Sequence, residues 1–179
     1  GIPMVFFDRT VEKVKASQVR MDDYIMAFFM VEALLRKGYK HIIHIPGPAY
    51  IRNSYERLSG YRDALEKFHV EYQPQDVLSP ALSAEEGSWV MKQYLQQNVP
   101  FDAVFGFTET AVLGAKSEIQ KQGLRIPNDV ALCCMSGTAL ATLVHPQLTA
   151  VEQPIGKMAQ ESCRLLMEHI TAVSYTHLT

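Results

Sequence analysis

The stretch FDAVFGFTETAVLGAKSEIQKQGLRIPNDVALCCMSG, residues 101–137, decides the fold class. It opens with a short apolar run at 102–107, continues with a helical segment at 112–122, and closes with a second apolar run at 129–135. Gly123 follows the helical segment, which is the usual place for a glycine that ends a helix. A strand, a helix and a strand in this order are typical of two parallel strands joined by a crossover helix.

The same alternation extends in both directions from this stretch. A helix from the N-cap pair Asp22-Asp23 to about Lys37 is expected to end at Gly38, and Ser83 with Glu86 forms a capping box. The further expected strands are 3–7, 41–45 and 148–153, and the further expected helices follow Arg57, Ser83 and Pro154, the last covering 155–169. The chain is therefore predicted to be α/β, with parallel sheets flanked by helices.

Sheets of this kind bind ligands beyond the carboxyl ends of their strands. In this sequence those ends are Asp8-Arg9, the loop after Ile45, Thr108-Glu109 and Ser136-Gly137. We expect the functional site there.

Composition restricts the class of protein. The chain has 179 residues, 47% of them hydrophobic, with 17 basic against 19 acidic residues. Near-neutral charge argues against binding a phosphate backbone with this stretch. No window has the roughly 20 apolar residues of a membrane span, and the first residues lack the basic region of a signal peptide. Three cysteines make no disulfide framework, so a cytoplasmic protein is expected.

The residues that could be reactive or could bind a metal are interpreted as structural. Cys133 and Cys134 are adjacent in an expected strand, so they point to opposite faces and fill the core, while Cys163 stands alone. His41 and His44 also lie on opposite faces, which disfavours a metal site. The sequence has no nucleophile elbow, phosphate loop or zinc-protease motif, so no enzyme activity, cofactor or metal is predicted.

Six phrases in order resemble the effector-binding core of LacI/GalR-family transcription regulators. They occupy residues 1–9, 19–48, 56–67, 101–115, 123–137 and 145–170. The resemblance implies a periplasmic-binding-protein-like fold of two lobes, with a small effector between them. It also implies an incomplete N-terminal lobe: 1–20 and 152–172 would belong to that lobe, 21–151 would be the C-terminal lobe, and 173–179 would be a tail outside the family pattern.

Ligand contacts are carried over from the family by position. Arg57 aligns with the arginine that clamps the ligand, although helix geometry alone favours a surface arginine. The resemblance places Arg52, Asn53 and Ser54 in the loop that leads to it. The other implied contacts are Asp8, Leu82, Thr108, Glu109, Ser136 and Gln153. Replacing Arg57 by alanine is expected to abolish the effector response without unfolding the protein.

Three of these positions depart from the family pattern. Leu82 stands where relatives often have an aromatic ring, Thr108 replaces an asparagine, and Ser136 replaces an aspartate. The departures leave the fold expectation unchanged but remove polar groups that would recognise a sugar. A polyol is still compatible with Asp8, Arg57 and Glu109, and an acidic or different small effector is the alternative.

The resemblance implies the sensing core of a DNA-binding regulator. A sugar-like effector would control binding to operator DNA through a helix-turn-helix that lies outside this sequence, in a homodimer, with no membrane involved. The alternative is a periplasmic sugar-binding protein of an importer, and an enzyme on a flavodoxin-like sheet is a more distant alternative.

Overall fold

The computed structural model describes residues 2–9 and 14–176 of the chain. They form two compact units, residues 1–22 with 153–179, and residues 23–152. We call them the first and the second unit. The second unit contains every helix and strand between β2 and α6.

A four-stranded parallel sheet forms the centre of the second unit. Its strands are adjacent in chain order, β3 (Ile42–Ile45), β4 (Ala103–Gly106), β5 (Ala131–Gly137) and β6 (Thr149–Glu152). Every residue of β3 and β4 is buried. A strand that is covered on both faces needs apolar side chains on both of them. Polar and apolar residues therefore do not alternate in these segments.

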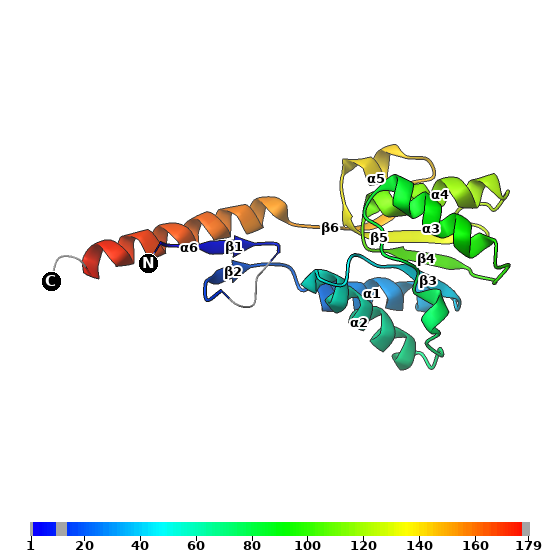
Figure 1. The fold of residues 1–179 in the computed structure, drawn as a ribbon, viewed down its shortest axis with the longest axis horizontal. Coiled ribbons are helices and arrows are strands. Elements are labelled where there is room, and N and C mark those ends of the chain that lie inside the picture. The colour runs from blue at the N-terminus through cyan, green and yellow to red at the C-terminus, as the bar shows by residue number, and fades with distance from the viewer. Residues whose placement is uncertain (1, 10–13, 177–179) are drawn as a thin grey trace. The chain divides into compact units, whose positions relative to one another are not determined.

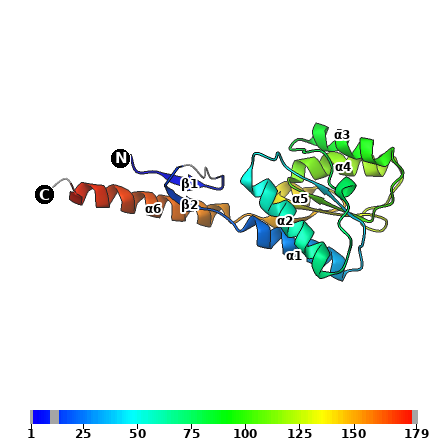
Figure 2. The same ribbon diagram turned by 60° about the horizontal axis from the view of Figure 1, so that its bottom comes forward.

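Helices cover both faces of this sheet (Figures 1 and 2). On one face, α1 (Asp23–Arg36) packs against α2 (Arg52–Lys67). On the other, α3 (Ala84–Leu95) packs against α4 (Glu109–Lys121), beside the short α5 (Ala139–Leu143). A single 3-10 turn at Pro74–Asp76 lies between α2 and α3. The predicted α/β class with parallel sheets flanked by helices is confirmed.

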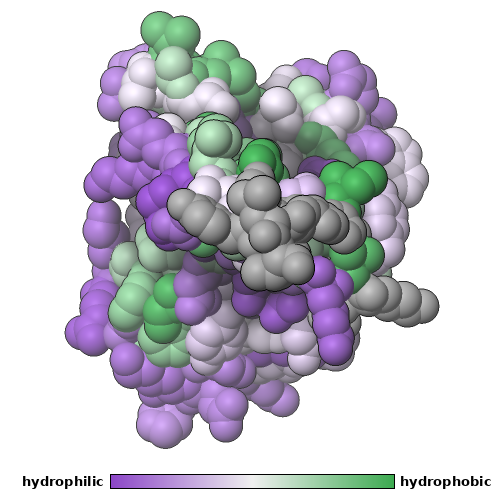
Figure 3. Space-filling model, turned by 90° about the vertical axis from the view of Figure 1, so that its left-hand side faces the viewer, coloured by the Kyte–Doolittle hydropathy of each residue, from purple (hydrophilic) through white to green (hydrophobic). Residues whose placement is uncertain are grey.

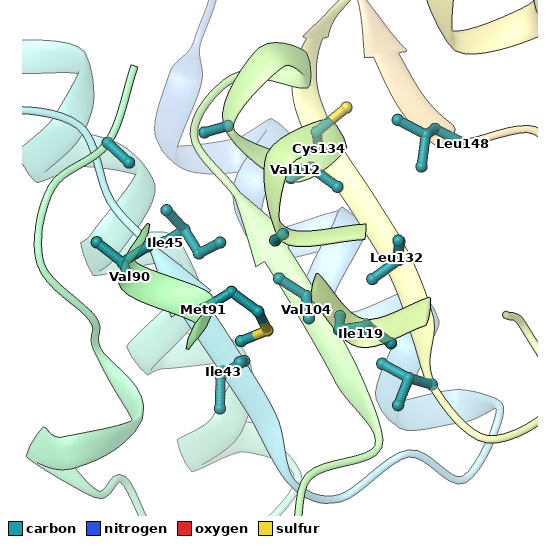
Figure 4. Packing of buried hydrophobic residues seen from close by; sticks show 14 of the residues in the cluster. Ile43, Ile45, Val90, Met91, Val104, Val112, Ile119, Leu132, Cys134 and Leu148 are labelled. Atoms are coloured by element: carbon teal, nitrogen blue, oxygen red, sulfur yellow. The ribbon is translucent and has the colours of Figure 1, made fainter. Parts of the chain in front are cut away.

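The main apolar core lies between the sheet and the α3–α4 face (Figure 4). Ile43, Ile45 and Val104 point from the sheet toward Val90 and Met91 on α3. Alternate residues of the same strands point the other way, so His44 stacks against Tyr61 of α2 and against Phe105. The second face of the sheet therefore contains an aromatic group with a buried histidine.

The first unit consists of two short strands and a long helix. β1 (Val5–Phe7) and β2 (Ser17–Val19) pair in parallel, and α6 (Ile155–Thr176) packs against both. β2 was not expected, because three residues give no periodicity. α6 is longer than predicted and continues through part of the expected tail at 173–179, of which 177–179 lie outside the described residues.

Helix starts differ from the sequence prediction in two places. α4 begins at Glu109, because the Thr108 hydroxyl accepts a hydrogen bond from the Ala111 amide and caps the helix. α2 begins at Arg52, so Arg52, Asn53 and Ser54 lie in its first turn and not in a preceding loop. Both predictions placed the start at the first residue with helical periodicity and overlooked the polar first turn.

Glycines at the contact between α3 and α4 yield a prediction for stability. A Cβ on Gly87 would lie 2.0 Å from the Ala111 carbonyl oxygen, and one on Gly114 would lie 1.9 Å from that of Ala84. We expect Gly87→Ala and Gly114→Ala each to lower the free energy of unfolding by about 1–3 kcal/mol, because the helices must separate. Gly156→Ala is the control, since that Cβ meets no atom within 4 Å. Urea unfolding curves that show equal stability for all three variants would contradict this packing.

The paired cysteines give a second prediction. Cys133 and Cys134 are buried free thiols, as predicted for core residues. Burial raises the pKa of both thiols, that of Cys134 to about 12, so neither ionises near neutral pH. Changing both to alanine should lower the free energy of unfolding by about 1 kcal/mol per residue and leave ligand affinity unchanged. A loss of affinity at unchanged stability would show that the thiols act in binding.

Candidate functional site at the carboxyl ends of the strands

Arg57 forms the centre of a polar network at the carboxyl ends of β3, β4 and β5. Its side chain is 1% exposed. Its Nε donates to Asp23 Oδ1 at 2.7 Å, its Nη1 to the Phe107 carbonyl at 2.6 Å, and its Nη2 to Ser136 Oγ at 3.3 Å. The guanidinium also lies over the Phe107 ring, 4.2 Å from its centroid. Arg57 therefore links a helix to the ends of two strands and is not a surface arginine.

Asp23 is the counterion of Arg57, and sequence reasoning missed it. It is the first residue of α1 and is buried, with Arg57 Nη2 2.6 Å from its Oδ1. Asn53 Nδ2 donates to its other oxygen at 2.7 Å. The sequence carried a partial signal, because Asp23 is the second acid of the N-cap pair. Its partners lie 30 and 34 residues away, which local patterns do not reveal.

The first turn of α2 is tied to the loop that follows β3. Ser54 Oγ donates to the Gly47 carbonyl at 2.7 Å, and the Ile51 amide donates to the Pro48 carbonyl at 3.0 Å. Arg52 lies on the partly exposed side of this turn and pairs with Glu56 at 2.8 Å. The loop thus holds Asn53 and Arg57 inward and leaves Arg52 accessible.

Ser136 lies inside β5 and adopts a backbone conformation that is rare for its residue type. Its φ is 59°. A left-handed serine costs free energy that the surrounding structure must supply, and such positions cluster at functional sites. Asp8, which follows β1 in the first unit, has the same feature with a φ of 60°. Two of the predicted ligand residues therefore share this unusual conformation.

Glu109 organises the segment that follows β5. Its carboxylate accepts hydrogen bonds from the Thr138 hydroxyl at 2.6 Å and from the Thr138 amide at 3.3 Å. Thr138 in turn caps α5, which exposes Leu140 and Leu143. Apolar residues are seen at the top of Figure 3, where Figure 1 places α5. Glu109 is buried, and its hydrogen bonds with Thr138 hold the segment that follows β5 in place.

The side chain of Thr108 contacts the backbone of Leu82. The hydroxyls of Thr108 and Thr110 both donate to the Leu82 carbonyl, at 3.2 and 2.5 Å, and the Leu82 amide donates to Glu86. The peptide groups of Leu82 are thus engaged inside the protein. Its side chain is half-buried and supplies an apolar contact surface with no aromatic face.

The predicted site residues fall into two classes. Asn53, Ser54, Arg57 and Glu109 are buried, and their polar groups bond to other parts of the second unit. The accessible members are Asp8, Arg52, Leu82, Thr108, Ser136 and Gln153, of which Asp8 and Gln153 belong to the first unit. The buried class forms the frame, and the accessible class can touch a ligand.

Comparison with known proteins identifies the family. Residues 31–177 match the model of the periplasmic binding protein-like domain. The chain belongs to this family. Among curated relatives, the HTH-type transcriptional repressor CytR of Escherichia coli K12 is 30% identical over 94% of this chain and 49% of its own length. The regulator CelR of Thermobifida fusca is 31% identical over 96% of this chain and 51% of its own length.

Solved structures agree with this assignment. The structure titled transcriptional regulator CelR–cellobiose complex superposes with a TM-score of 0.88 at 29% identity, covering 94% of this chain and 52% of that chain. A LacI-family regulator from Sanguibacter keddieii superposes with a TM-score of 0.86 at 27% identity, covering 94% of this chain and 63% of that chain. The resemblance to LacI-family effector-binding cores that the sequence indicated is therefore confirmed.

This periplasmic binding protein-like chain spans about half the length of the curated relatives it matches. Those relatives are named as transcription regulators. Among the residues that the structure describes, no helix is long and apolar enough to cross a membrane, and no three side chains gather as metal ligands.

Proposed function

We propose that this chain is the effector-sensing core of a LacI-family regulator, with the ligand held at the carboxyl ends of β3, β4 and β5. The observation that carries the proposal is the buried Arg57 network, which joins α1, α2 and the ends of β4 and β5 through one side chain. A ligand that touches the accessible edge of this network would act on several elements together. Effector-dependent movement of a lobe requires such coupling.

A carbohydrate is the effector class that the accessible groups favour. Arg52, Thr108 and Ser136 offer a guanidinium and hydroxyls, which suit the donors and acceptors of a polyol. The family resemblance also implies contacts from Asp8 and Gln153, a carboxylate and an amide. A regulator with this fold is known with cellobiose, and another relative is named a ribose operon repressor. Leu82 supplies no aromatic ring for stacking, so polar contacts must provide most of the specificity.

Operator binding is proposed to reside in a helix-turn-helix outside this sequence, within a cytoplasmic homodimer. The formal net charge of −2 supports placing the DNA contact elsewhere in the protein. The importer alternative is not favoured, because the relatives are regulators. An enzyme is disfavoured by the inert, buried thiols and by the relatives' activity as regulators.

The proposal is tested on the full-length protein with operator DNA selected by that protein from its own genomic fragments. Fluorescence anisotropy would measure operator affinity with and without cellobiose, ribose and further mono- and disaccharides. We expect one sugar to change the affinity for DNA at least tenfold. Binding of a sugar without any change in DNA affinity would favour the importer class, and the absence of any sugar effect would contradict a carbohydrate effector.

A further inference from the structure

A cavity of about 390 Å³ opens at the amino end of β3, the end opposite to Arg57. Lys40, His41 and Ile42 line one side. The opposite side is lined by residues of α2 and of the segment that follows it, namely Tyr61, Leu65, His69, Val70, Glu71, Gln73 and Asp76. All of them belong to the second unit, and none is among the residues of the site described above.

Asp76 is a buried carboxylate with few hydrogen bonds. Its side chain lies in the cavity wall, and the residue is 6% exposed. Among the described residues the one donor to this carboxylate is the Tyr94 hydroxyl, 3.3 Å from Oδ1. Burial raises the pKa of Asp76. A buried carboxylate ordinarily accepts several hydrogen bonds, so this group has unused acceptor capacity.

Neighbouring donors do not fill that capacity. The Tyr61 hydroxyl donates to the Ile42 carbonyl at 2.7 Å, so its proton is not available to Asp76. The backbone amides of Lys40 and His41 both donate to Asp102. Further donors to Asp76 have to come from the cavity, either from water or from a bound molecule.

The rim carries charges of both signs. Lys40 is positively charged and Glu71 negatively charged, and the imidazoles of His41 and His69 add hydrogen-bonding nitrogens. A ligand with only an ammonium group would satisfy Asp76 but would face Lys40, and an anion would be repelled by Asp76. A metal ion is not favoured, since the described residues bring no three metal-ligating side chains together.

We propose that this cavity binds a small zwitterion of amino-acid size, with its ammonium group on Asp76 and its carboxylate toward Lys40 and His41. The ammonium supplies the charged donors that the buried carboxylate lacks. Val70, which is partly exposed and lines the cavity, offers an apolar surface for the carbon chain between the two charged groups. The cavity volume suits a compact ligand. The site is independent of the proposed sugar site, and neither proposal depends on the other.

The test is isothermal titration calorimetry of the full-length protein at pH 7 with three probes. γ-Aminobutyrate carries both charges, butylammonium carries the amine alone, and butyrate carries the carboxylate alone. We expect γ-aminobutyrate to bind in a 1:1 ratio, and each single-charge probe to bind at least tenfold more weakly. Equal binding of butylammonium and γ-aminobutyrate, or binding of no probe, would overturn the proposal.

Variants locate the binding site. Asp76→Asn keeps the shape of the side chain and should weaken γ-aminobutyrate at least tenfold, whereas Asp63→Asn, on the exposed side of α2, should leave its affinity unchanged. Lys40→Gln should weaken γ-aminobutyrate several-fold without affecting butylammonium, and it tests the site even if Asp76→Asn fails to fold. Unchanged γ-aminobutyrate affinity in folded Asp76→Asn or in Lys40→Gln would overturn the assignment.

Discussion

Replacing Asp23 by alanine is expected to lower the free energy of unfolding by about 3–5 kcal/mol, because it leaves a buried guanidinium without its counterion. Arg57→Ala should have an effect of similar size, since it leaves the Asp23 carboxylate buried without the guanidinium that faces it. Both residues are almost fully buried, so solvent does not screen the pair. Urea unfolding followed by circular dichroism measures the change.

The controls separate the buried pair from ion pairs in general. Glu168→Ala breaks an exposed pair with Arg164 and should change stability little. The double variant Asp23→Leu with Arg57→Leu should lose much less than the sum of the two alanine changes, because no buried charge is left unpaired. Single variants within 1 kcal/mol of the wild type would refute this role for the pair.

The burial of Arg57 also revises the expectation that Arg57→Ala removes the effector response without unfolding the protein. The arginine was expected to act as a ligand clamp. In the structure its donors are engaged by Asp23, the Phe107 carbonyl and Ser136. Loss of response in Arg57→Ala therefore has to be judged against the stability of that variant, and accessible residues give the clearer test of binding.

Acid should destabilise the protein through His44, and His44→Leu should remove that part of the effect. His44 is fully buried between Tyr61 and Phe105; its Nδ1 pairs with the Phe105 carbonyl, and its Nε2 has no partner. Burial lowers the pKa of His44 to about 4. The unfolded chain binds a proton near pH 6.5, whereas the folded chain resists until about pH 4.

The sign follows from which state binds more protons. Above pH 6.5 both states are neutral at this residue and it has no effect. As the pH falls from about 6.5 to about 4, only the unfolded state gains the proton, so stability declines by about 3 kcal/mol in total. Carboxylates with lowered pKa values, such as Glu32 and Asp129, also make the protein less stable in acid. Their effect is the same in the wild type and in His44→Leu.

The measurement is therefore a difference between two proteins. Unfolding free energies of the wild type and of His44→Leu would be compared at several pH values between 4 and 7.5. We expect the unfolding free energy of His44→Leu to rise relative to that of the wild type as the pH falls. Parallel pH profiles for the two proteins would show that His44 is not buried in its neutral form.

Local signals in the sequence predicted most of the second unit. The capping box at Ser83 and Glu86 is present, and Gly38 and Gly123 adopt the positive φ values that end α1 and α4. β2 escaped prediction because a strand of three residues has no measurable period, and pairing with β1 defines it. Thr108 was interpreted as a ligand residue alone, although its hydroxyl also caps α4.

The candidate site was predictable only in part. Strand ends indicated where it lies, and the resemblance selected Arg57. The pairing of Arg57 with Asp23 could not be predicted, since it depends on how α1 and α2 pack and not on either helix alone. For the same reason, the division into buried frame residues and accessible contact residues emerged only with the tertiary structure.

The most direct test of the central claim is calorimetric titration of cellobiose and ribose into the full-length protein and two serine variants. Ser136→Ala removes an accessible hydroxyl at the proposed site, and Ser117→Ala removes an exposed one on α4 as the matched control. For the sugar that binds, we predict at least a tenfold loss of affinity in Ser136→Ala and none in Ser117→Ala. Equal affinities in wild type, Ser136→Ala and Ser117→Ala would contradict a sugar site at the carboxyl ends of these strands.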